Sequence, residues 1–273
     1  MNPQATLSTP PSGFDPRFAL DVMIPLAEAA YAVMQNPGAN PPLPEGFQQT
    51  ALLQADETQR RTMLGKPDSP QARVVAELLE DSGVFGLIGK NPATNTAFVS
   101  FRGTQTPGEW LEDFDAIFEP YKFVPGGGFA HQGFQSVYAA LRDSVRAGLA
   151  NAIAGCNRLL ITGHSLGAAL AVIAAPDIVK NLTPGVAAEL ITFAGPASGL
   201  NDFAHFFDRL IPSCYRVVNF WDLVPHVPPQ APLGLYQHAG TEVKVNGGMA
   251  DAKKAHSLEQ SYVPGLKKLL PRG

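Results

Sequence analysis

The fold of this chain is decided by nine residues, Ile161-Thr162-Gly163-His164-Ser165-Leu166-Gly167-Ala168-Ala169. Their centre fits G-x-S-x-G, the pattern of a nucleophile elbow. The five residues before it, 158–162, form an apolar run of strand length, and 168–173 is a run of small, helix-forming residues. A tight turn from strand to helix needs glycines because the backbone crowds itself there, and it lifts the serine hydroxyl clear of the sheet. The segment therefore predicts an α/β protein with Ser165 as nucleophile, against the alternative of an ordinary glycine-flanked turn.

Helical and strand patterns alternate around this motif. The predicted elements are helices at 132–154, 165–180 and 201–210 and strands at 158–162, 189–194 and 214–220. Such alternation requires crossover connections, which give a mainly parallel central sheet flanked by helices. With a nucleophile elbow this is the α/β-hydrolase architecture. Elsewhere the patterns predict a helix at 16–34 with an irregularity at Pro25, strands at 47–54, 84–90, 96–102, 235–238 and 241–245, a hairpin turn at 91–95, and a short helix from about Ser257.

The composition is typical of one compact enzyme domain. The chain has 273 residues, of which 45% are hydrophobic, and we expect a single domain at 16–273 after a loose tail at 1–15. The net charge of −4 and the absence of any Lys/Arg cluster disfavour nucleic-acid binding. No apolar run approaches the ~18 residues of a membrane span, and the polar start lacks the apolar core of a secretory signal. The compartment therefore stays open between the cytoplasm, export by another route and a signal already removed.

The two cysteines, Cys156 and Cys214, each precede a predicted strand. If one strand lies between those two, the cysteines are about 9.5 Å apart, which is too far for a disulfide. We expect both thiols to be free.

The carboxylate of a catalytic triad should follow the serine in the sequence. A serine hydroxyl is a weak nucleophile that needs a base, and the base needs an orienting carboxylate. In the α/β-hydrolase order the acid follows the serine and the histidine comes last. Asp222 directly follows the predicted strand 214–220, at the sheet edge where the elbow lies. Its alternative role is to cap the turn into the proline-rich loop that follows.

Three histidines follow Asp222 and compete for the role of base. His226 is four residues on, close enough to be a local loop partner, and His238 lies in a predicted strand. His256 comes after the last strand and its turn, where a loop can return over the sheet edge to Ser165. We therefore predict a triad of Ser165, Asp222 and His256, with His238 and His226 as the alternative bases.

An oxyanion hole needs two amides aimed at the developing charge. One is predicted to be that of Leu166, directly after the nucleophile, and the other to come from the loop after an earlier strand. The strand at 96–102 is followed by Gly103, so the second amide is predicted to be that of Thr104. The alternative is the glycine run 126–128, which lies far beyond that strand.

A possible lid follows the oxyanion residue. In the segment 105–120, apolar residues fall at i, i+1, i+4, i+7 and i+8, which is one helical stripe: Trp110, Leu111, Phe114, Ile117 and Phe118. A helix with this stripe is predicted to cover the pocket in water and to meet lipid when open. The alternative is an amphipathic helix fixed on the body.

Several motifs together resemble the class 3 lipases, the α/β-hydrolases typified by filamentous-fungal triacylglycerol lipases. The motifs lie in the order of that family between about residues 84 and 262: 99–104, Trp110 with Asp113, 131–134, 163–169, 192–196, 216–219 with 222–225, and His256. The resemblance implies the same triad and the same oxyanion residues, and it places the lid at the segment after Thr104. The fungal secreted members carry disulfides that two cysteines cannot reproduce.

These features predict a serine carboxylester hydrolase, a lipase acting on acylglycerol esters without metal or organic cofactor. A phospholipase A1 and a feruloyl-type esterase would use the same triad on another substrate. The alternative from another class is a catalytically silent lipid- or acyl-binding protein, which would not need all three triad residues.

Overall fold

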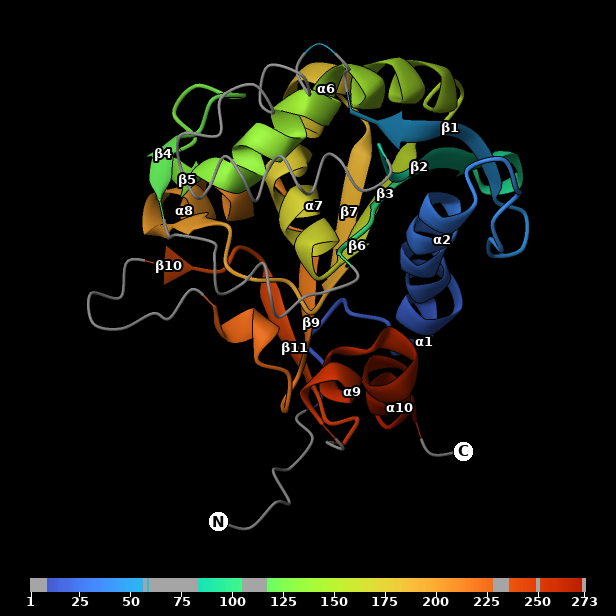
Figure 1. The fold of residues 1–273 in the computed structure, drawn as a ribbon, viewed down its shortest axis with the longest axis vertical. Coiled ribbons are helices and arrows are strands. Elements are labelled where there is room, and N and C mark those ends of the chain that lie inside the picture. The colour runs from blue at the N-terminus through green and yellow to red at the C-terminus, as the bar shows by residue number, and fades with distance from the viewer. Residues whose placement is uncertain are drawn as a thin grey trace.

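The computed structural model describes residues 9–55, 58, 83–104, 117–227, 236–248 and 251–271. Figure 1 shows them as a central twisted sheet with helices on both faces. Within these ranges the main sheet has seven strands in the order β1-β2-β3-β6-β7-β9-β11. They are β1 (Gln48–Gln54), β2 (Val84–Asn91), β3 (Thr96–Phe101), β6 (Arg158–His164), β7 (Ala187–Phe193), β9 (Cys214–Asn219) and β11 (Thr241–Val245).

The strand directions agree with the alternation seen in the sequence. From β3 to β11 all neighbours pair in parallel, whereas β1, β2 and β3 pair antiparallel. The prediction of a mainly parallel sheet is confirmed, and so is the hairpin turn, which is a short 3-10 turn at Pro92–Thr94 between β2 and β3. One strand, β7, separates β6 from β9, and Cys156 and Cys214 are free thiols as expected.

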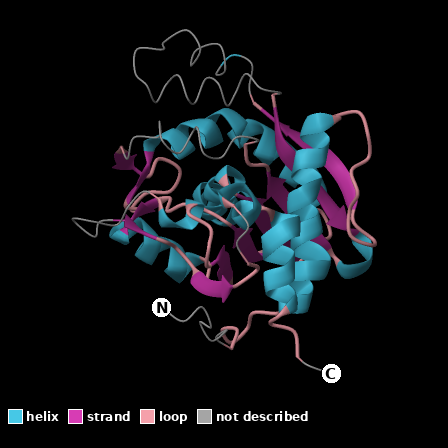
Figure 2. Ribbon diagram, turned by 60° about the horizontal axis from the view of Figure 1, so that its bottom comes forward, coloured by secondary structure: helices cyan, strands magenta, loops and turns pink. Residues whose placement is uncertain are grey.

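Both faces of the sheet are covered, which gives the chain two hydrophobic clusters. One cluster lies under α6 (Gln132–Ala152), α7 (Leu166–Asp177) and α8 (Asn201–Leu210), and the other under α2 (Ile24–Gln35) and α10 (Val263–Lys267). Figure 2 shows helices on the two sides of the sheet. Because successive side chains of a strand point to opposite faces, Val99 of β3 enters the first cluster and its neighbour Phe98 the second.

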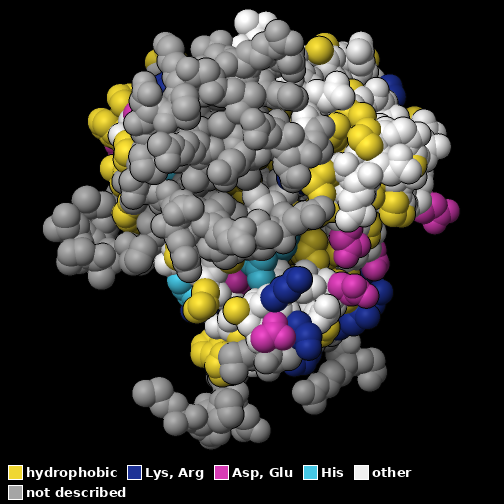
Figure 3. Space-filling model, viewed as in Figure 1, with side chains coloured by type: hydrophobic (Ala, Val, Ile, Leu, Met, Phe, Trp, Pro, Cys, Tyr) yellow, Lys and Arg dark blue, Asp and Glu magenta, His cyan; other side chains and the backbone are white. Residues whose placement is uncertain are grey.

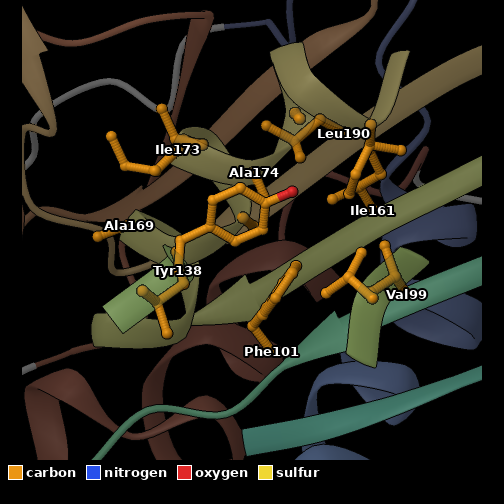
Figure 4. Close-up of a cluster of buried hydrophobic side chains, with 14 of the residues drawn as sticks. Val99, Phe101, Tyr138, Ile161, Ala169, Ile173, Ala174 and Leu190 are labelled. Atoms are coloured by element: carbon orange, nitrogen blue, oxygen red, sulfur yellow. The ribbon is translucent and has the colours of Figure 1, made fainter. Parts of the chain in front are cut away.

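The first cluster anchors the helix that follows the predicted nucleophile. In Figure 4, Val99 and Phe101 of β3 and Ile161 of β6 lie around the ring of Tyr138 from α6. Ala169, Ile173 and Ala174 of α7 complete this cluster. Every residue of α7 is buried, so the direction of the helix, and with it the position of its first amides, is fixed by packing.

The N-terminal helix has the predicted irregularity. A short α1 (Pro16–Phe18) and a π-helical turn (Ala19–Met23) lead into α2, whose second residue is Pro25. Proline has no N–H to donate to the preceding turn, and a wider turn accommodates this loss. Residues 16–35 are long and apolar enough to cross a membrane by length and composition alone. Half of that stretch is buried inside the protein, as expected of a core helix.

The predicted loose tail at 1–15 is wrong for its last residues. Phe14 is only 7% exposed and its ring lies 5.4 Å from that of Tyr215. The Tyr215 hydroxyl donates to the backbone oxygen of Ser12, and Asp15 caps the first helical turn. A single aromatic residue among prolines has no periodicity, so only the tertiary structure reveals this anchor. Residues 1–8 lie outside the described ranges.

A second, smaller sheet contains the last residue of the predicted lid stripe, so the prediction was wrong at that end. Its strands, in the order β10-β8-β5-β4, are β4 (Phe118–Pro120), β5 (Phe129–His131), β8 (Gly199–Leu200) and β10 (Tyr236–Gln237). Phe118 was expected on the helical stripe but begins β4, where it pairs with His131 and stacks on Tyr236. Cross-strand aromatic contacts outweigh the helical spacing at this position.

The C-terminal segment after β11 contains one more helix than predicted. The expected helix near Ser257 is present and begins with the π-helical turn Leu258–Tyr262. The Ser257 side chain caps this turn by accepting a hydrogen bond from the Gln260 amide. Before it lies α9 (Ala252–His256), capped by Asp251. Its five residues are too few to show a hydrophobic period. His256 therefore lies at the end of a helical turn rather than in an open loop.

Candidate active site

Ser165 has the strained backbone of a nucleophile elbow. Its φ is 58° and its ψ is −127°, a conformation that costs a residue with a side chain on the order of 1–3 kcal/mol. A Cβ on Gly163 would lie 2.3 Å from the backbone oxygen of Gly167, and a Cβ on Gly167 would lie 2.2 Å from that of Phe101. Both positions therefore exclude any side chain. The two glycines allow β6 to turn sharply into α7, as the sequence motif predicts.

Asp222 lies just after β9, and its two carboxylate oxygens have separate partners. Oδ1 accepts from the Val224 amide at 3.0 Å, which is the turn-capping role considered for this residue. Oδ2 accepts from Nδ1 of His256 at 2.9 Å and from the Tyr262 hydroxyl at 2.6 Å. The side chain is 1% exposed. The capping role and the orienting role are thus both present in one buried carboxylate.

His256 is oriented by this carboxylate so that its other nitrogen is free. Because Nδ1 faces a carboxylate, it carries the proton, and Nε2 presents a lone pair. Nε2 of His256 and Oγ of Ser165 are both buried, and within the described ranges neither has a hydrogen-bond partner. The His256 ring lies 4.6 Å, centroid to centroid, from the ring of His164, which directly precedes the serine. The Asp–His pair is formed, and the serine and the base are two unpaired groups in one buried region.

The two alternative bases are held elsewhere. His226 is exposed in a 3-10 turn, Val224–His226. His238 has its Nε2 2.7 Å from the backbone oxygen of Pro225. Burial, followed by the nearby charge of Arg216, lowers the pKa of His238 to about 4. Because its ring N–H donates to the Pro225 backbone oxygen, His238 is not the histidine that Asp222 orients.

The oxyanion residues lie where the ends of β3 and β6 meet, since Phe101 pairs with Gly163 in parallel register. A Cβ on Gly103 would lie 3.0 Å from Cβ of Ser165, so the backbone before Thr104 touches the nucleophile. Thr104 is 8% exposed, and its Oγ1 has no hydrogen-bond partner among the described residues. Leu166 begins α7, whose first amides have no partner within the helix.

The alternative oxyanion loop, the glycine run 126–128, belongs to the hairpin between β4 and β5. A Cβ on Gly127 would meet the ring of Tyr121, and one on Gly128 would meet Asp202 and Phe203. These glycines are needed for a tight hairpin packed on α8.

Three residues of the predicted lid stripe, Trp110, Leu111 and Phe114, lie outside the described residues. Ile117 is 40% exposed, and Phe118 belongs to β4 as described above. Over the described ranges no three His, Cys, Asp or Glu side chains gather as metal ligands do.

Four polar residues near the triad were missed by the sequence reasoning. Tyr262 donates to Asp222, and burial followed by the Asp222 charge raises the pKa of its phenol well above the usual range, so it stays a donor. Asn219 of β9 donates to the Ala255 backbone oxygen and accepts from the Gly247 amide, which fixes the segment carrying His256. The others are His164 and Tyr31. His164 lies inside the elbow motif and Asn219 inside the motif 216–219, whereas Tyr31 and Tyr262 carry no sequence signal.

Together these groups can perform acyl transfer. A buried carboxylate orients an imidazole, a strained turn presents a hydroxyl, and Thr104 and Leu166 are the residues predicted to supply the oxyanion amides. This is the set of parts that nucleophilic attack on an ester carbonyl requires.

Comparison with known proteins identifies relatives over part of the chain. The model of the family described as Lipase (class 3) matches residues 98–231. A secreted mono- and diacylglycerol lipase of Fusarium solani is 29% identical over 172 residues, covering 62% of this chain and 50% of the relative. A chloroplastic phospholipase A(1) of Arabidopsis thaliana is 33% identical over 147 residues, covering 48% of this chain and 33% of the relative. The chain thus spans half or less of the length of these relatives.

A solved structure extends the likeness to three dimensions. A triacylglycerol lipase in which a serine protease triad forms the catalytic centre superimposes with a TM-score of 0.54 at 27% identity, covering 58% of this chain and 60% of the other. With the mainly parallel sheet and the elbow, this confirms the predicted α/β-hydrolase fold.

Proposed function

We infer, from the premise that this chain belongs to the class 3 lipase family, that it hydrolyses carboxylic esters of acylglycerols through an acyl-enzyme. The observation that carries the inference is a pair of buried atoms, Ser165 Oγ and His256 Nε2, which have no hydrogen-bond partner in the part of the chain that the structure describes, together with an Asp222–His256 hydrogen bond of 2.9 Å. Leaving two polar atoms unpaired costs about 1–3 kcal/mol each. A binding protein would gain nothing from this cost, whereas an enzyme needs a serine hydroxyl that can attack the ester and a base that can take and return the serine proton.

The proposed reaction follows from the roles of these groups. Nε2 of His256 takes the proton from Oγ of Ser165 as the oxygen attacks the ester carbonyl carbon. The amides of Thr104 and Leu166 donate to the oxyanion, and Asp222 stabilises the imidazolium. The ester C–O bond then breaks, and the alcohol leaves with the proton from His256. Water enters, gives a proton to His256 and attacks the acyl-enzyme carbonyl. The bond to Oγ of Ser165 then breaks, Oγ takes the proton back from His256, and the carboxylic acid leaves.

Two assays test the proposal. An activated phosphonate is expected to label one serine stoichiometrically, and peptide mapping is expected to place the label on Ser165. A panel of p-nitrophenyl esters and emulsified triglyceride should be hydrolysed by the same preparation. An unlabelled protein that binds fatty acid and turns over none of these esters would instead be a lipid- or acyl-binding protein.

A second substrate class is favoured by one comparison. Because a phospholipase A(1) is 33% identical over 147 residues, phosphatidylcholine belongs in the panel. Release of the sn-1 acid faster than hydrolysis of triglyceride would make this chain a phospholipase with the same triad.

We further propose that the protein works at a lipid–water interface. Large hydrophobic side chains are exposed among the described residues: Ile117 at 40%, Phe129 at 43%, Phe220 at 54% and Leu223 at 69%. Figure 3 shows hydrophobic side chains scattered over one face of the molecule, some of them near a patch of histidine surface that also borders charged side chains. The sequence adds Trp110 and Phe114 of the predicted lid stripe. Such groups gain transfer energy on reaching an apolar phase.

The interface proposal predicts a jump in rate when a long-chain ester exceeds its solubility. Replacing Trp110 and Phe114 together with serine should remove the jump, because each aromatic contributes about 2 kcal/mol of transfer energy. Activity on a soluble short ester should survive and serves as the control. Rates that run smoothly through the solubility limit would mean that the segment is a fixed wall and the protein an esterase.

A further inference from the structure

Two hydrogen bonds join Tyr31, which packs against the backbone before the oxyanion residue, to the catalytic histidine. The hydroxyl of Tyr31, on α2, is 2.8 Å from Nδ1 of His164. Nε2 of the same imidazole is 2.8 Å from the backbone oxygen of His256. At the other end, the Tyr31 hydroxyl oxygen packs against the backbone of Gly103. This chain of contacts therefore runs from the residue before Thr104, through two side chains, to the residue that carries the base.

The direction of each bond is fixed by the chemistry of its partners. A carbonyl oxygen only accepts, so Nε2 of His164 carries a hydrogen and donates to His256. Burial, and then the neighbouring His256, lower the pKa of His164 well below its usual range, so the imidazole is neutral. Its Nδ1 must then accept, and the donor is the Tyr31 hydroxyl.

Packing around this chain leaves little room for any part to move alone. His164 is 7% exposed, and its ring contacts both the Tyr31 ring and the His256 ring. A Cβ on Gly103 would lie 2.3 Å from the Tyr31 oxygen and 2.7 Å from the His164 backbone oxygen. In a close-packed interior a shift of one group is transmitted to its neighbours.

We propose that Tyr31 and His164 are positioning residues, which hold the oxyanion backbone at Gly103–Thr104 and the backbone of His256 in register with Ser165. Both nitrogens of His164 and the hydrogen of the Tyr31 hydroxyl are already used within the chain. These two side chains therefore act through the backbones they bind and not on the substrate. The inference rests on the proposed ester hydrolysis, because register matters only if the serine and its base react.

The geometry explains why such a device is useful. His256 comes at the end of the short helix α9, far in sequence from Ser165, whereas His164 is the serine's immediate neighbour. A hydrogen bond from His164 to His256 therefore ties the base directly to the elbow. Because a displacement of about 1 Å can cost on the order of a hundredfold in rate, losing this tie should be visible in kcat.

The test compares three variants. Tyr31→Phe removes only the hydroxyl and is expected to lower kcat on a soluble ester about tenfold with KM little changed. His164→Leu removes the donor to His256 and is expected to lower kcat further, towards a hundredfold. His164→Gln restores an N–H within reach of the same carbonyl and is expected to recover part of that loss. The rate of phosphonate labelling of Ser165 should fall in the same order.

A double-variant comparison separates positioning from general destabilisation. If Tyr31 acts through His164, adding Tyr31→Phe to His164→Leu should reduce kcat little further, whereas independent effects would multiply. Tyr121→Phe is the matched control, because it removes another phenol hydroxyl that donates to a backbone oxygen, that of Ile173, at 2.7 Å. It is expected to lower Tm and to leave kcat unchanged.

Each result bears on a different inference. If the wild-type protein is neither labelled nor active, the proposed function fails. If it is active and folded Tyr31→Phe matches Tyr121→Phe in kcat, the positioning role is overturned. A change in KM alone, or effects of Tyr31→Phe and the His164 variants that multiply, would overturn it too. If His164→Leu does not fold, kcat is instead compared among Tyr31→Phe, His164→Gln and the variant that combines both changes. Effects on kcat that do not multiply support the positioning role, and effects that multiply overturn it.

Discussion

Ser165→Ala is expected to abolish ester hydrolysis, with kcat falling on the order of a millionfold. The change deletes the one atom that attacks the carbonyl and leaves only the binding and oxyanion contributions. Folding should be nearly unaffected, since Oγ of Ser165 has no hydrogen-bond partner among the described residues to lose. An alanine with a positive φ already occurs in this protein, since Ala194 has a φ of 56°. The measurements are kcat on a soluble ester and Tm.

Ser144→Ala is the matched control for this variant. Its hydroxyl accepts from the Gln54 amide and donates to the Leu52 backbone oxygen on the outer part of the sheet. It should keep full activity while losing some stability. A Ser165→Ala protein that retains more than about a thousandth of the wild-type kcat would show that another group is the nucleophile.

His256→Ala is expected to be about as damaging as Ser165→Ala, because the two groups act as a unit and either loss disables the step. Asp222→Asn should be severe but milder, about ten-thousandfold, because an amide at this position favours the wrong imidazole tautomer. The readout is kcat on a soluble ester, with circular dichroism to confirm the fold.

His238→Ala supplies the comparison that decides the identity of the base. Its imidazole is hydrogen-bonded to the Pro225 backbone oxygen, so its removal should cost stability and little activity. A large loss of kcat from His238→Ala, together with an active His256→Ala, would reverse the assignment.

Most of the framework could be predicted from the sequence because its elements carry strong local patterns. The helix at 201–210 and the strand at 241–245 have the bounds that the sequence predicts. Buried parallel strands read as apolar runs, and helices between them show their own period. The candidate nucleophile could be predicted for the same reason, since a strained turn between strand and helix requires glycines at fixed positions.

The remaining errors share a cause. Phe118 fits a helical stripe by spacing but lies in β4, and Phe14 looks like part of a loose tail but packs on Tyr215. In both cases the aromatic side chain contacts an aromatic partner that is far away in the sequence, Tyr215 for Phe14 and Tyr236 for Phe118. The spacing of neighbouring residues in the sequence does not predict such contacts.

By itself, the sequence determined the alternating architecture, the elbow at Ser165 and the chain order in which an acid and a base had to follow. It left three histidines as candidates for the base. Only the tertiary structure decided between them, by placing Nδ1 of His256 on Asp222 and Nε2 of His238 on a backbone carbonyl. It also brought Tyr31 and Tyr262, from opposite ends of the chain, to the site. The physical reason is the distance along the sequence over which each feature is determined. The elbow and the strands depend on neighbouring residues, whereas the choice of the base depends on which side chains from distant parts of the sequence come into contact.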